Sequence, residues 1–90
     1  MAPPKRDWDT AYLEKKEELT DGLRLELDLI EERIVTDPNR TYQRTYLDDG
    51  VIVDASGFDE YGFEVSYLPI GDDPYRPDVF RFVGFTHEDR

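Results

Sequence analysis

The spacing of apolar residues changes once along the chain, near residue 40, and this change constrains the fold more than any other feature. From Trp8 to Ile34, apolar residues recur at steps of three, four or seven, which is the period of one face of an α-helix. After Arg40, β-branched and aromatic residues lie between turn signals, as in β-strands. The sequence therefore predicts an α+β fold, in which an N-terminal amphipathic helical segment packs on a sheet.

The helical segment is predicted over residues 8–35, either as one helix or as two helices in a hairpin. Residues 20–22 (Thr-Asp-Gly) favour a break, because glycine inside a helix costs about 1 kcal/mol relative to alanine. Residues 23–29 alternate as a strand would, but their leucine, arginine and glutamate residues favour a helix and none is β-branched. Pro38 ends the segment, because it pushes Asp37 out of the helical conformation.

Four antiparallel strands are predicted in residues 41–85, in the order of a meander. They cover residues 41–47, 51–56, 63–68 and 79–85. With Asp49-Gly50 at the centre of the first hairpin, Tyr46 would lie opposite Val53. The side chains expected to face the helix from this hairpin are those of Tyr42, Tyr46, Val51 and Val53. The whole chain is expected to form one domain, with a flexible leader at residues 1–6 and a tail at residues 86–90.

The charge of the chain limits its partners. It has 22 acidic residues against 11 basic ones, a net charge of -11 in 90 residues. Such a charge disfavours direct binding of nucleic acid, which binds proteins mainly through Lys and Arg. It favours a protein partner with a basic surface, or it only keeps a small domain soluble. The sequence has no cysteine and no apolar run of membrane-spanning or signal-peptide length, so we expect a cytoplasmic protein without disulfides or membrane contact.

No catalytic residue, metal site or cofactor is predicted. The only histidine, His87, lies close to the C-terminus, where a held catalytic geometry is unusual. The pairs at residues 48–49 and 72–73 (Asp-Asp) lack the alternating ligand spacing of a calcium loop, and turn formation explains them. The main hypothesis is therefore a non-enzymatic interaction module.

The residues predicted to bind a partner are helix carboxylates, and aromatic and acidic residues of two loops. Carboxylates one helical turn apart lie about 5–6 Å from each other, comparable with phosphate spacing along a nucleic-acid strand. The module could therefore inhibit a protein by competing for its basic nucleic-acid-binding surface. Loop aromatics either anchor an interface or fold back over a small core. The candidates are Glu14, Glu17, Glu18, Asp21, Asp28, Glu31, Glu32, Phe58, Asp59, Glu60, Tyr61, Asp72, Asp73 and Tyr75. A homodimer through an exposed sheet edge or the helix is a further possibility.

The C-terminal third of the chain resembles the RelE/ParE toxin family. Residues 62–67 (GFEVSY) and 79–87 (VFRFVGFTH) are similar to the closing strands of that family, and a helical segment before an antiparallel sheet is similar too. The resemblance implies a small toxin, held by an antitoxin, that cleaves ribosome-bound messenger RNA or inhibits gyrase. By position, it would make Arg81, with Arg44 and His87, the remnants of an RNA-cleaving site. The chain departs from the family in lacking a clear initial strand and in having few basic residues on the sheet.

Overall fold

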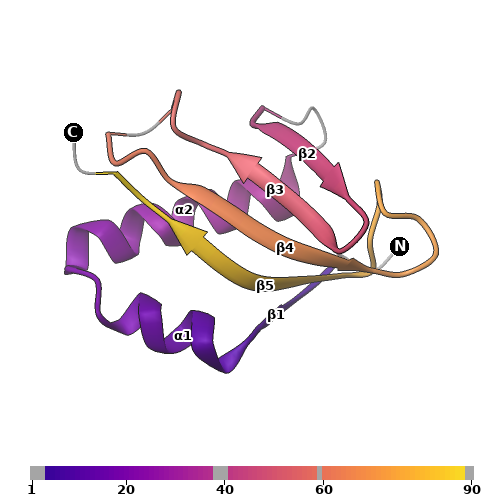
Figure 1. Ribbon diagram of the computed structural model, residues 1–90, viewed down its shortest axis with the longest axis horizontal. Coiled ribbons are helices and arrows are strands. Elements are labelled where there is room, and N and C mark those ends of the chain that lie inside the picture. Colours follow the sequence, from indigo (N-terminus) through magenta and orange to yellow (C-terminus); the bar gives the residue numbers. More distant parts are fainter. Residues whose placement is uncertain (1–3, 38–40, 59, 89–90) are drawn as a thin grey trace.

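The computed structural model describes residues 4–37, 41–58 and 60–88, which form two helices on one face of a five-stranded sheet (Figure 1). The elements follow one another as β1 (Lys5–Trp8), α1 (Thr10–Glu17), α2 (Asp21–Thr36), β2 (Gln43–Leu47), β3 (Gly50–Asp54), β4 (Glu64–Ile70) and β5 (Val79–Thr86). The strand order is β1-β5-β4-β3-β2. Neither described helix is long and apolar enough to cross a membrane.

The sheet is mixed, because its first strand runs parallel to its neighbour. β1 lies along β5, with Lys5 opposite Val79 and Trp8 opposite Phe82. The prediction of four antiparallel strands is therefore wrong at this edge, and Lys5 and Arg6 belong to a strand and not to a flexible leader. Four residues with one apolar side chain carry almost no strand signal. Pairing with a strand more than 70 residues later in the chain is what makes them a strand.

The helical segment forms two helices, as the break at residues 20–22 indicated. Thr20 is the N-cap of α2, and its side chain accepts a hydrogen bond from the backbone N–H of Leu23. Gly22 lies inside the first turn of α2, so the cap and not the glycine marks the boundary. Residues 23–29 are helical, as predicted, and α2 ends at Thr36, one residue beyond the predicted end. The prediction is wrong at its start, because Trp8 belongs to β1 and α1 begins at Thr10.

The hairpin of β2 and β3 has the predicted inner face but a different register. Tyr46 lies opposite Val51, which places residues 48 and 49 at the centre of the turn. The predicted pairing of Tyr46 with Val53 is thus wrong by two residues. Because side chains alternate with a period of two, a slip of two leaves each one on its side of the sheet. Val51 and Val53 are accordingly buried under the helices.

A β-bulge in β5 brings two phenylalanines to the core. Phe82 lies opposite Tyr67 and Gly84 opposite Ser66, so Val83 is an extra residue in β5. Without it, Phe82 and Phe85 would point to opposite faces of the sheet, because they are three residues apart. With it, both pack on Tyr12 of α1, at ring-centroid distances of 5.9 Å and 5.1 Å.

We predict that Gly50→Ala destabilises the protein. Gly50 has a φ angle of +148°, and a Cβ atom there would lie 3.0 Å from the carbonyl oxygen of Tyr67. We expect a loss of about 1–3 kcal/mol in the free energy of unfolding, measured by urea denaturation. Gly84→Ala is the matched control, because its Cβ would meet nothing within 4 Å. It should change the free energy by less than about 0.5 kcal/mol, and equal losses in both variants would contradict this account.

Candidate functional site

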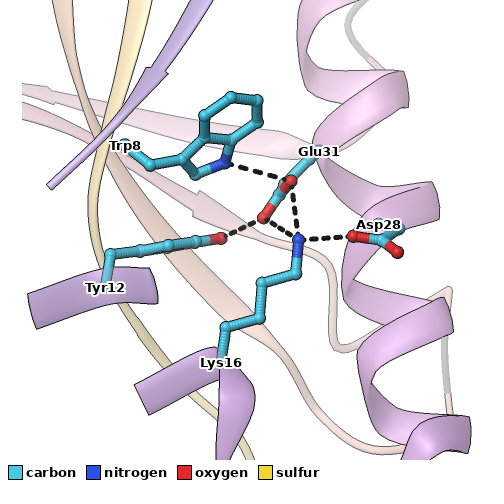
Figure 2. Close-up of polar contacts among 5 residues, drawn as sticks. All are labelled: Trp8, Tyr12, Lys16, Asp28 and Glu31. Atoms are coloured by element: carbon cyan, nitrogen blue, oxygen red, sulfur yellow. Dashed lines mark hydrogen bonds and ion pairs between the residues drawn. The ribbon is translucent and has the colours of Figure 1, made fainter. Parts of the chain in front are cut away.

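A buried carboxylate, that of Glu31, lies at the centre of a polar cluster between β1 and the two helices (Figure 2). It accepts hydrogen bonds from the Tyr12 hydroxyl at 2.6 Å, the indole N–H of Trp8 at 3.2 Å and the Lys16 ammonium at 3.1 Å. Lys16 also pairs with Asp28. A buried carboxylate is costly unless its oxygens are hydrogen-bonded, and these donors meet that requirement. The cluster therefore joins β1, α1 and α2, and we refer to it as the Glu31 cluster.

The position of Glu31 corrects the prediction that it belongs to the exposed acidic face. Glu31 is 2% exposed. In the helix it lies one turn from Leu27 and one turn from Ile34, both of which are buried, so it stands on the flank of the apolar face. From the sequence alone, a charged residue at the border of the apolar face is expected to face solvent. Here two helices and a strand enclose it.

The Tyr12 hydroxyl is a permanent donor in the Glu31 cluster. Burial raises the pKa of Tyr12 far above its ordinary value, and the negative charge of Glu31, its hydrogen bond and the charge of Asp28 raise it further. The hydroxyl therefore keeps its proton at all physiological pH values. Because it keeps its proton in that range, the Tyr12 hydroxyl is suited to holding α1 against α2 as a hydrogen-bond donor.

The side of the sheet that faces away from the helices carries Arg81. Its guanidinium pairs with Asp7 at 2.5 Å and also with Asp9. The hydrogen bond and the charge of Asp9 raise the pKa of Arg81 above its ordinary value, with a smaller contribution from Asp7. Two carboxylates thus compensate one cation, and each accepts a hydrogen bond from one of its two terminal nitrogens. In this state Arg81 offers little attraction to a phosphate group.

The other two residues implied by the family resemblance do not join Arg81. Arg44 donates to the Tyr67 hydroxyl and to the carbonyl oxygen of Ile34, both at 3.0 Å, so it ties β2 to the last turn of α2 on the helix side of the sheet. His87 is half-buried, with its ring 5.4 Å from that of Phe63. Arg81, Arg44 and His87 therefore do not converge on one site.

Residues 86–88 lie against the fold and do not form a solvated tail. Thr86 is the last residue of β5, and the backbone N–H of Glu88 donates to the carbonyl oxygen of Tyr61 at 2.8 Å. The prediction of a tail at residues 86–90 is thus wrong for residues 86–88.

The predicted helix carboxylates form two sets, one that is exposed on and just after α1 and one that forms ion pairs on α2. Glu14, Glu17 and Glu18 are exposed on α1 and beyond its end. Asp28 pairs with Lys16, and Glu32 pairs with Arg6 at 2.5 Å. Asp21 lies 3.6 Å from Arg24. These three carboxylates of α2 are exposed too, but each lies beside a cation, so α2 contributes less net negative charge than the sequence indicated.

The aromatic loop residues lie partly against the core and partly in solvent. Phe58 is 57% exposed, yet its ring is 5.2 Å from that of Tyr42. Tyr61 is half-buried and packs against Phe63. Tyr75 is 56% exposed and lies 4.8 Å from the ring of Tyr46. Both interpretations of these rings, core cap and contact residue, remain compatible with the geometry.

The acidic loop residues fit turns. Asp73 accepts a hydrogen bond from the backbone N–H of Tyr75 at 2.9 Å, which closes the loop before β5. Asp72 and Glu60 are exposed. Asp59 lies outside the described residues. Across residues 4–37, 41–58 and 60–88, no group of three or more His, Asp or Glu side chains is arranged to hold a metal ion.

An open hollow of about 360 Å³ lies between α1 and the end of β5, but its cation is already engaged. Its lining includes Lys15, Glu64 and Ser66. The Lys15 ammonium donates to the carbonyl oxygen of Phe85 at 2.5 Å and lies 4.7 Å from the centre of the Phe85 ring. Lys15 thus covers the edge of β5 beyond the point where β1 ends.

Asp7 and Asp9, which decide the state of Arg81, were not among the predicted site residues. Their signal in the sequence is their position on either side of Trp8. In an extended chain, residues two apart lie on the same side, opposite the residue between them. Trp8 points to the Glu31 cluster, so Asp7 and Asp9 point to the other side of the sheet, toward Arg81. This spacing indicates the positions of Asp7 and Asp9 only once β1 is known to be a strand.

The fold is similar to that of the RelE toxin of E. coli. The crystal structure of the isolated E. coli RelE toxin matches 97% of this chain and 86% of its own, with a TM-score of 0.60 and 16% identity. The intact E. coli RelBE toxin-antitoxin complex contains a chain that matches with a TM-score of 0.61 and 15% identity, over 97% of this chain and 99% of that one. No protein-family model and no curated protein sequence matches. The resemblance predicted from the last strands is thus confirmed for the fold of nearly the whole chain.

We predict that Glu31→Ala destabilises the protein by about 3–5 kcal/mol, because it leaves the Tyr12 hydroxyl and the Trp8 indole N–H without their acceptor and Lys16 with Asp28 alone. Glu31→Gln keeps an acceptor and should lose less. The matched control is Glu32→Ala, which removes one exposed ion pair and should cost less than about 1 kcal/mol. Urea denaturation measures all three, and a loss as small for Glu31→Ala as for Glu32→Ala would contradict the role of the cluster.

Alkaline pH should weaken the fold through Tyr12. Above pH 10 the unfolded chain releases the Tyr12 proton, whereas the folded chain retains it because its pKa is raised. The unfolded state then binds fewer protons, so the free energy of unfolding falls by about 1.4 kcal/mol per pH unit for this group. The stabilisation is complete below about pH 10 and is lost as the pH rises further.

Tyr12→Phe should therefore reduce the slope of the unfolding free energy against pH above about pH 10. Tyr75→Phe, which alters an exposed ring, is the control and should leave the slope unchanged. The same slope in Tyr12→Phe as in the unsubstituted protein would refute the raised pKa.

Proposed function

We propose that this chain is a small toxin-like protein of a toxin–antitoxin pair, which acts in the cytoplasm by binding a protein and not by cleaving RNA. The observation that carries the first half is the similarity to E. coli RelE over 97% of the chain, both for the isolated toxin and for the toxin in complex with its antitoxin. A chain with this fold is suited to being held by a protein partner, as RelE is in the RelBE complex.

The second half of the proposal rests on electrostatics. Cleavage of a phosphate backbone calls for cations that stabilise developing negative charge. Arg81 lies on the solvent-facing side of this sheet, and its guanidinium forms ion pairs with Asp7 and Asp9. The net charge of -11 repels an RNA strand before any such contact forms. These features favour a protein target, as in gyrase inhibition, over ribosome-bound RNA.

A second candidate is the non-enzymatic inhibitor that competes for a basic nucleic-acid-binding surface. The exposed carboxylates of α1, those of Glu14, Glu17 and Glu18, favour it. Both candidates place the action on a protein. They differ in the surface that meets it: the acidic helices for the inhibitor, and another part of the fold for the toxin-like protein.

Induced expression in a bacterial host tests the proposal. We expect growth to stop while the 5′ ends of messenger RNAs, mapped by sequencing, stay unchanged. Arg81→Ala, expressed at the same level and checked for folding by circular dichroism, should still stop growth, because Arg81 is not used for cleavage. The inhibitor candidate does not require growth to stop in this host.

Two results would contradict the proposal. Unchanged growth would reject the toxin-like function. New messenger RNA ends that disappear with Arg81→Ala would show that the chain cleaves RNA after all.

A further inference from the structure

The side of the sheet opposite the helices carries an apolar band. Ile70 lies opposite Val79, and Leu68 lies opposite Arg81, whereas the buried residues between them face the helices. The band contains Leu47 from β2, Ile52 from β3, Leu68 and Ile70 from β4, and Val79 and Val83 from β5. Leu47 and Ile70 are 49% and 45% exposed, and the others are half-buried. In Figure 1 both helices lie on the other side of the strands.

Acidic residues flank this band at both ends of the strands. At one end Asp54 lies directly opposite Glu64 on the neighbouring strand, where like charges repel. At the other end the turn between β2 and β3 contains Asp48 and Asp49. The loop before β5 contains three aspartates, Asp72, Asp73 and Asp78, against one cation, Arg76. All of these acidic residues are exposed.

The strands carry few positive charges that could compensate these acidic flanks. On this side of the sheet, the strand residues with positive charge are Arg81, which Asp7 and Asp9 compensate, and Lys5 at the edge of the sheet. The surface is thus apolar in the middle and negative at both ends.

We propose that the apolar band is the docking surface for an amphipathic segment of a protein partner, with an apolar stripe bordered on both sides by Lys and Arg. This inference rests on the proposed function, since it names the kind of partner such a protein would bind. Apolar side chains of the segment would cover Leu68 and Ile70, and its cations would meet the acidic flanks.

Charge argues against the other occupants of this surface. A second copy of the chain would bring the same acidic flanks together, and like charges in an interface are unfavourable. A nucleic-acid strand would bring phosphates to the same carboxylates and would leave the apolar side chains uncovered. A basic amphipathic segment would cover the apolar middle with its apolar side chains and would place its cations beside the acidic residues at both ends.

The competing surface is on α2, where Leu25 and Leu29 are 64% and 59% exposed. They form a narrow stripe on one helix, next to the acidic face described above. A basic segment drawn only by negative charge would settle there or on α1. The position at which such a segment binds therefore distinguishes the two surfaces.

The test is an NMR titration of the full ¹⁵N-labelled chain with a synthetic helical peptide of roughly 18 residues that has leucines on one face and lysines on the borders of that face. We expect shifts in backbone amides of β3, β4 and β5 around Ile52, Leu68 and Ile70. A matched peptide with glutamate in place of lysine should not bind. Shifts confined to α1 and α2, equal binding of both peptides, or no binding would overturn the inference.

Two substitutions of exposed residues sharpen the result. Ile70→Asp adds a charge to the band and should weaken peptide binding at least about tenfold, whereas Leu25→Asp makes the same change on α2 and should leave the affinity unchanged. The dispersion of the NMR spectrum shows that each variant is folded. The reverse order of effects would contradict the inference.

This binding assay is independent of the growth assay. Unchanged growth together with shifts on β3–β5 would reject the toxin-like function and leave the docking surface standing. Arrested growth together with shifts confined to the helices would reject the docking surface and leave the function standing.

Discussion

The hydrogen-bonded burial of Glu31 is the interaction on which the rest of this structure depends. Its donors come from β1 and α1, while the carboxylate itself belongs to α2. Trp8 is drawn to the helix side of the sheet by this cluster, and the chain around it is extended as β1. Alternation then turns Asp7 and Asp9 toward Arg81 on the opposite side. The buried carboxylate and the pairing of β1 with β5 thus together hold the edge of the sheet, and with it the two aspartates that compensate Arg81.

A shared fold does not by itself transfer an activity. The chain follows the fold of E. coli RelE from β1 to β5, at 16% identity. The chemistry of a site belongs to its side chains and not to the strands that carry them. Here the solvent-facing side has a compensated arginine, an apolar middle and acidic ends, and these features support the proposal of a protein target.

The features that the sequence could predict are local ones. The change of apolar period near residue 40 is a property of neighbouring residues, and so are the break before α2 and the turn acids at residues 48–49. The inner face of the first hairpin was also predictable, because it survives a slip of two residues. The exposed leucines of α2, Leu25 and Leu29, follow from the same helical period that buries Leu27.

The features that could not be predicted depend on contacts between distant segments. β1 is a strand because β5 lies beside it, and the bulge at Val83 is visible only in the pairing of β4 with β5. Glu31 looks like a surface residue until Trp8 and Tyr12 are placed against it. Arg81 looks like a free cation until Asp7 is known to be on a strand. Each of these features depends on residues that lie far away along the chain.

The central claim is that this fold presents a surface that does not engage RNA. The most direct measurement is the fluorescence anisotropy of a labelled single-stranded RNA, titrated with the protein at a low ionic strength of about 50 mM, where electrostatic binding is strongest. The account predicts no saturable rise in anisotropy and an RNA that stays intact on a gel. A saturable, salt-sensitive rise with cleavage of the RNA would contradict it.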